Sequence, residues 1–126
     1  MGKEFTAKFS DGSERFAASM AMGRAALFYD IAVLLERYVG QSCGISVDNG
    51  MDEHEIDPDV FIAFFELVWK AGWIAEADGF IAGWASHAAG MIENITLEPR
   101  TWIDRDGVEL KVARYLRNDE LGISGS

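Results

Sequence analysis

The sequence predicts an α+β fold in which about three helices pack on a small antiparallel sheet that includes a C-terminal hairpin. Three observations support this prediction. Apolar and polar residues alternate over residues 3–9, three later stretches space their apolar side chains as helices do, and the last third returns to alternation around Asp106-Gly107. The 126 residues contain no internal repeat or linker, so we expect one globular domain over residues 1–126, with 118–126 as a loosely held polar tail.

The first strand is predicted over Lys3–Phe9, because phenylalanine and alanine alternate there with charged and polar residues. Asp11-Gly12 ends it. A long helix is predicted next, from about Glu14 to Val39, and Gly40 is a typical helix stop. The apolar stripe that predicts this helix has spacings of three, four and seven, and it consists of Phe16, Met20, Leu27, Ile31, Leu34, Leu35 and Tyr38.

The second predicted helix has the clearest start in the chain. Asp57 is able to cap the exposed amides, and Pro58 suits the first helical position because its missing N–H would be unpaired there. We expect this helix to extend to about Ala77. It is apolar almost all round, which is typical of a helix at the centre of a fold or covered by a partner.

A third helix is predicted from Phe80 to about Asn94. One side of it is aromatic and aliphatic, and the other side carries the small residues Gly79, Gly83, Ser86 and Gly90. Small side chains permit a close backbone approach, so we expect neighbouring helices to pack tightly against this side.

The C-terminal hairpin is predicted from Asp106-Gly107, since both positions tolerate a positive φ. A two-residue turn places Ile103 opposite Leu110 and keeps one face apolar. The other register sets Trp102 against Leu110 and mixes the faces, so we expect the first.

Composition excludes several functions. The chain carries 21 acidic and 11 basic residues, a net charge of −10, which repels phosphate backbones and favours a basic protein surface as partner. We therefore expect no direct nucleic-acid binding. Cys43 is the single cysteine, which is typical of a reducing compartment. No leader peptide is recognised and no apolar run is long enough for a membrane span, so a cytoplasmic location without membrane contact is expected.

The most distinctive segment is acidic and leads into the second predicted helix. Its carboxylates are Asp48, Asp52, Glu53, Glu55, Asp57 and Asp59. Carboxylates at this density could hold a hard cation, but their spacing does not match the calcium loop of helix–loop–helix proteins, and no metal site is expected. Two other interpretations stay open: a solvated loop before a helix N-terminus, and a recognition patch for a basic protein surface.

The candidate catalytic groups do not form a convincing set. Ser86 and His87 are neighbours on a helix, so their side chains point about 100° apart and make no direct pair. Cys43 and His54 are a conceivable dyad that nothing else in the sequence supports. We assign no catalytic residue and expect no cofactor. An aromatic pocket between the second and third helices is a further hypothesis, with the candidate residues Trp69, Trp73, Trp84 and His87.

Three functions follow as hypotheses. The first is a small acidic protein-binding domain that docks on a basic, nucleic-acid-binding surface of its target, as immunity proteins and phage or mobile-element inhibitors do. The second is a small-molecule-binding domain or minor enzyme that uses the aromatic pocket. The third is a structural subunit of a homodimer, with the apolar second helix and the small-residue side of the third at the interface.

Overall fold

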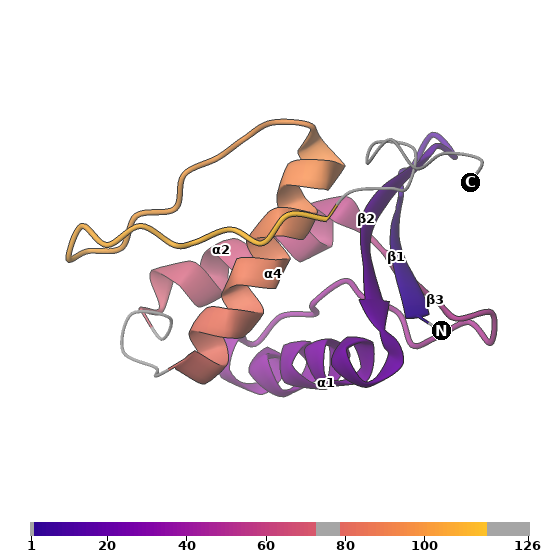
Figure 1. The fold of residues 1–126 in the computed structure, drawn as a ribbon, viewed down its shortest axis with the longest axis horizontal. Helices are drawn as coiled ribbons and strands as arrows, with labels where there is room; N and C mark the ends of the chain where they lie inside the picture. Colours follow the sequence, from indigo (N-terminus) through magenta and orange to yellow (C-terminus); the bar gives the residue numbers. More distant parts are fainter. Residues whose placement is uncertain (1, 73–78, 116–126) are drawn as a thin grey trace.

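The computed structural model describes residues 2–72 and 79–115, and these form an α+β fold. Strands β1 and β2 and helix α1 come first along the chain, followed by strand β3 and helices α2 and α4 (Figure 1). Their bounds are Gly2–Lys8 for β1, Glu14–Ala21 for β2, Met22–Val39 for α1, Glu53–Ile56 for β3, Pro58–Lys70 for α2 and Gly79–Thr96 for α4.

The sheet is mixed, whereas the sequence predicted an antiparallel one. Its order is β2-β1-β3, with β1 antiparallel to β2 and parallel to β3. A tight turn joins β1 to β2, which forces them to be antiparallel. The chain returns to β3 only after α1 and a long connection, so it is able to enter the sheet in the same direction as β1.

The prediction of a single helix over residues 14–39 was wrong in its first part. Glu14–Ala21 forms β2, and α1 begins at Met22. Spacings of four residues fit a helix, yet this segment pairs with β1 from Glu14 opposite Lys8 to Ala21 opposite Gly2. Asp11-Gly12 is therefore a hairpin turn, in which Gly12 has a φ of 90°.

The helix-end signals were read correctly at two points. Gly40 adopts a φ of 71° and its amide donates to the carbonyl of Glu36, which closes α1. The Asp57 carboxylate accepts the amide of Val60 at 3.3 Å, with Pro58 as the first residue of α2. The predicted end near Ala77 was wrong, because α2 stops at Lys70 and Gly72 follows with a φ of 77°.

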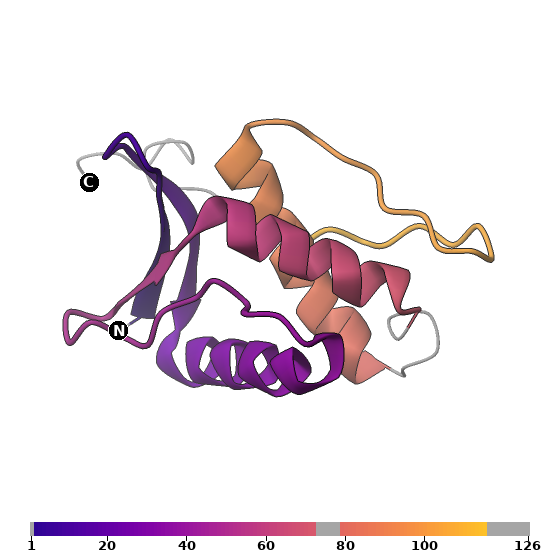
Figure 2. The same cartoon turned by 180° about the vertical axis from the view of Figure 1, so that it is seen from behind.

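The three helices all lie on one side of the sheet, as Figures 1 and 2 show from opposite directions. Aromatic rings fill the space between them. The Trp84 ring stacks on Phe28 at 5.4 Å, and its indole N–H donates to the Phe28 carbonyl at 3.2 Å. Phe65 contacts Trp84, Trp69 and Trp102 with ring centroids 4.7–6.5 Å apart, so α2 joins α4 to the C-terminal segment.

The segment after α4 turns near Gly107 and returns along α4 (Figure 1). Within residues 97–115 it makes one isolated antiparallel bridge, between Ile103 and Glu109, and this bridge lies outside the three-stranded sheet. The predicted pairing of Ile103 with Leu110 was wrong. Trp102 is buried and Ile103 is exposed, because Trp102 is the side chain that packs on α2.

The small-residue side of α4 packs against this returning segment. The amide of Ala113 donates to the carbonyl of Ser86 at 3.1 Å, and a methyl group added at Gly90 would overlap the Ala113 carbonyl oxygen. The expected partner there was a neighbouring helix. At Gly90 and Ser86, the close approach is instead to extended chain.

Gly90→Ala should therefore lower the free energy of unfolding by about 1–3 kcal/mol, since backbone must move to make room for the methyl group. Gly83→Ala on the same helix is the matched control. No atom lies within 4 Å of the added methyl group there, so removing a glycine from an exposed helix position should stabilise the protein by about 0.5–1 kcal/mol. Urea unfolding measures both, and equal effects of the two variants would contradict this packing.

Candidate functional site

The face of the sheet away from the helices carries a group of charged side chains. The β1 residues Glu4, Thr6 and Lys8 alternate with Phe5 and Ala7, which are fully buried toward the helices. Register extends this face across the sheet. The face, which we name the open face, includes Glu4, Thr6, Lys8, Glu14, Phe16, Ser19, Glu53 and Glu55. Thr6, at its centre, is only 5% exposed, so the charged side chains surround a covered middle.

Negative charge dominates the open face. Lys8 lies 2.9 Å from the Glu14 carboxylate and 4.0 Å from that of Glu53. Its hydrogen bond to Glu14, and then the nearby charges of Glu53 and Glu55, raise the pKa of Lys8. Among the described residues, the register places one basic side chain, Lys8, on this face beside the carboxylates of Glu4, Glu14, Glu53 and Glu55. Lys8 pairs with Glu14 and Glu53, so the described part of the face has a surplus of negative charge.

The outer edge of the sheet at β3 is already covered. The amides of Ser46 and Asn49 donate to the carbonyls of Glu55 and Glu53 at 2.9 and 3.0 Å. An added strand would need those carbonyls. The β3 edge is therefore not available to an added strand.

Four of the predicted acidic residues have other positions. Asp48 forms an ion pair with Lys3 at 2.7 Å, and this contact together with the Gly50 amide lowers the pKa of Asp48. Asp57 caps α2 and Asp59 lies in its first turn. Asp52 is exposed in the turn before β3, with a φ of 59°.

The structure therefore brings Glu53 and Glu55 together on the open face. Asp52 borders this face, because it lines a hollow with Glu4, Ser19 and Glu53. Asp48, Asp57 and Asp59 have other contacts or positions. The structure adds Glu4 and Glu14, which sequence reasoning did not select. The signal for Glu4 was present, because the alternation of residues 3–9 already placed it opposite Phe5. Glu14 was missed because its strand was predicted as helix.

His54 has a structural role in the described chain. Its ring stacks between Phe5 and Tyr29, with centroids 4.8 and 5.0 Å away, and Nδ1 lies 2.7 Å from the Ser46 carbonyl oxygen. The Cys43 thiol lies 4.0 Å from the Ile45 carbonyl, and burial raises the pKa of Cys43 to about 11. Neither contact joins the two residues into a dyad.

Cys43 should consequently be inert in the native protein. Its pKa rises from 9.0 to about 11, which lowers the thiolate fraction at neutral pH about a hundredfold. We expect Ellman's reagent to modify the native protein at least about a hundredfold more slowly than the urea-unfolded protein. Comparable rates in the two states would contradict the burial.

The raised pKa of Cys43 also makes the stability of the protein depend on pH. The folded state favours the neutral thiol, so the contribution of Cys43 to the free energy of unfolding is complete below the unfolded pKa of 9.0. This contribution is lost as the pH rises through about 11.

The predicted aromatic pocket is divided among different places. Trp84 and His87 line a pocket of about 250 Å³ between α1 and α4, not between α2 and α4. Trp69 packs on Phe65 and Trp102 and borders a separate hollow beside residues 104–111. Trp73 lies outside the described residues, as does the predicted tail over 118–126.

The surfaces that the homodimer hypothesis used are largely occupied within one chain. Phe61, Phe64, Phe65 and Val68 of α2 are fully buried, and Gly90 of α4 meets the C-terminal segment. The mass in solution remains the test of that hypothesis.

Within residues 2–72 and 79–115, no group of three His, Cys, Asp or Glu side chains is arranged to hold a metal ion. The helices in the same ranges lack the combined length and apolarity that a bilayer crossing requires.

Comparisons with protein-family models, with curated proteins and with solved structures found no match to this chain.

Proposed function

We propose that this protein is an acidic recognition domain whose open face docks on a basic surface of another protein. The observation that supports the proposal is the set of carboxylates of Glu4, Glu14, Glu53 and Glu55, which share the sheet face away from the described helices with Lys8. The net charge of −10 adds long-range attraction to a basic partner.

The sheet makes these carboxylates a rigid array. Residues two apart on one strand are separated by about 6.5 Å, and neighbouring strands by about 4.8 Å, so the backbone that carries the carboxylates loses little conformational freedom on docking. Such an array is suited to a groove lined with lysine and arginine. A groove of that kind normally receives phosphates, and the protein would act there as a competitive inhibitor of a nucleic-acid-handling enzyme.

Inhibitors and immunity proteins of phages and mobile elements work in this way, and we place the protein in that class. A cytoplasmic location belongs to the same proposal. The buried free thiol of Cys43 supports a reducing compartment.

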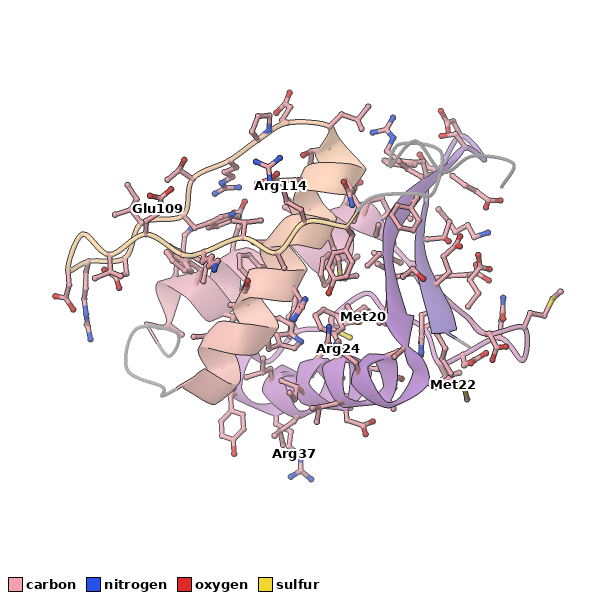
Figure 3. The ribbon with its side chains drawn as sticks, viewed as in Figure 1. Met20, Met22, Arg24, Arg37, Glu109 and Arg114 are labelled. Atoms are coloured by element: carbon pink, nitrogen blue, oxygen red, sulfur yellow. The ribbon has the colours of Figure 1, made fainter. Side chains whose placement is uncertain are left out.

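Capture from a lysate of the source cells tests the proposal with three baits. They are the wild type, the variant Glu4→Lys/Glu55→Lys on the open face, and the control Asp106→Lys/Glu109→Lys on the C-terminal segment. Both variants carry the same net charge of −6, because each reversal adds two to −10. The exposed side chains of Asp106 and Glu109 lie on the segment beyond α4, away from the sheet (Figure 1; Glu109 is labelled in Figure 3).

We expect one basic protein to be retained by the wild type and by the control bait, to be released as salt rises, and to be absent from the open-face bait. Retention of the same protein by all three baits would contradict docking through the open face.

The second candidate function, binding of a small molecule, is favoured by one observation. The pocket between α1 and α4 has apolar walls and places Arg24 and His87 at its lining.

A further inference from the structure

The pocket between α1 and α4 has the size of a small-ligand site. It measures about 250 Å³ and is lined by Arg24, Leu27, Phe28 and Ile31 of α1 and by Gly83, Trp84 and His87 of α4. A cavity of about 150 Å³ holds benzene. The pocket therefore has room for an aromatic ring with a short substituent.

The walls of the pocket favour a ligand with an apolar ring. Phe28 and Trp84 stack against each other, and the Trp84 indole N–H is already used by the Phe28 carbonyl. The indole thus offers its ring and no free donor. Leu27 belongs to the apolar stripe of α1, yet its side chain is 53% exposed. A ligand ring would cover this apolar surface, which is in contact with water in the free protein.

The polar groups of the pocket favour a ligand with a negative charge. Arg24 makes no hydrogen bond or ion pair within the described residues, although the chain carries 21 acidic side chains. Figure 3 shows Arg24 on α1, on the side that faces α4. A guanidinium that has no such partner among the described residues and lies beside apolar walls is suited to bind a carboxylate through two parallel hydrogen bonds.

His87 adds a donor next to Arg24. Burial, and then the charge of Arg24, lower the pKa of His87, which favours the neutral form of its ring. Its Nδ1 is hydrogen-bonded to the Tyr115 hydroxyl, and burial raises the pKa of Tyr115 to about 12, so the hydroxyl keeps its proton. When that hydroxyl donates to Nδ1, the histidine proton lies on Nε2 as a donor.

We infer that the pocket between α1 and α4 binds a small aromatic carboxylate, with its ring against Leu27, Ile31 and Trp84 and its carboxylate on Arg24. The inference is independent of the open face, because none of the residues that line the pocket belongs to that face.

Titration of the ¹⁵N-labelled protein with benzoate, phenylacetate and indole-3-acetate tests the inference by nuclear magnetic resonance. We expect saturable shifts of the Trp84 indole and His87 ring signals with at least one acid, and weaker binding of the matching neutral amide. Arg24→Gln should weaken binding at least about tenfold, since it removes a charge-assisted bond. Gly83→Leu should abolish binding by filling the pocket, because nothing lies within 4 Å of a side chain started there.

Arg37→Gln is the control on the same helix, at an exposed position of its last turn (Figure 3), and it should leave the affinity unchanged. The inference is overturned if none of the three acids shifts the two signals at millimolar concentration. It is also overturned if the Arg24→Gln variant binds the acid as tightly as the wild-type protein does, or if the wild-type protein binds the neutral amide as tightly as the acid.

Discussion

Phe65→Ala is expected to lower the free energy of unfolding by about 3–5 kcal/mol, the largest stability effect of any single change considered for this protein. Phe65 is fully buried, and its ring meets Trp69, Trp84 and Trp102. Truncation removes the apolar contact area and leaves a cavity that three large rings border. Because those rings come from α2, α4 and the C-terminal segment, the surrounding structure has little freedom to collapse into the space.

Chemical denaturation followed by tryptophan fluorescence measures this loss. Phe65→Leu retains most of the apolar volume and should show a distinctly smaller effect. Leu67→Ala is the control on the same helix, since Leu67 is 37% exposed, and it should cost less than Phe65→Ala. If Phe65→Ala unfolds at the denaturant concentration of the wild type, the aromatic core is not arranged as described.

Reversal of charge at Glu4 and Glu55 should weaken binding to the captured basic partner by about 30- to 100-fold, mainly through slower association. These two side chains have no ion pair with Lys3 or Lys8, so the variant should fold normally. Lysines at positions 4 and 55 would repel the basic side chains of the partner, which the two glutamates attract. Stopped-flow or biolayer measurements at low salt resolve the association rate, and thermal unfolding checks that the variant is intact.

The variant Asp106→Lys/Glu109→Lys has the same net charge and separates local from general electrostatics. It should lose only the modest part of the association rate that depends on total charge. An equal loss in both variants would mean that the net charge of the chain, rather than the open face, determines binding.

Local signals in the sequence predicted two helix ends well, the end of α1 and the start of α2. Asp57-Pro58 and Gly40 act through their own backbone geometry and their immediate neighbours, so the surrounding fold does not alter their effect. Residues 14–21 behaved differently. Their apolar spacing fits a helix as well as a strand, and pairing with β1 decides between the two. Asp11-Gly12 was the available clue, because the same dipeptide was taken as a turn at residues 106–107.

The candidate site was predicted in part for a similar reason. Glu53 and Glu55 were identified from charge density alone, which does not show which carboxylates share a face. Register adds that information, since Glu4 lies opposite Glu53 and Lys8 lies opposite Glu14. A parallel pairing across a connection as long as the one between β1 and β3 leaves no local pattern in the sequence.

The pocket between α1 and α4 was also beyond the sequence pattern. The predicted pocket grouped Trp84 and His87 with Trp69 and Trp73 of the second helix, whereas in the structure Trp84 and His87 line a pocket whose other wall is α1. Arg24 and Leu27 lie on α1, and the predicted apolar stripe treated Leu27 as core. In the structure Leu27 is 53% exposed and Tyr38 is 64% exposed.

Carboxyl footprinting of the complex tests the central claim most directly. The free protein and the complex with the captured partner are labelled with a carbodiimide and an amine, and each carboxylate is quantified by mass spectrometry. We predict that Glu4, Glu14, Glu53 and Glu55 lose label in the complex while Asp106 and Glu109 do not. Unchanged labelling of Glu4 and Glu55, with protection elsewhere on the chain, would contradict docking through the open face.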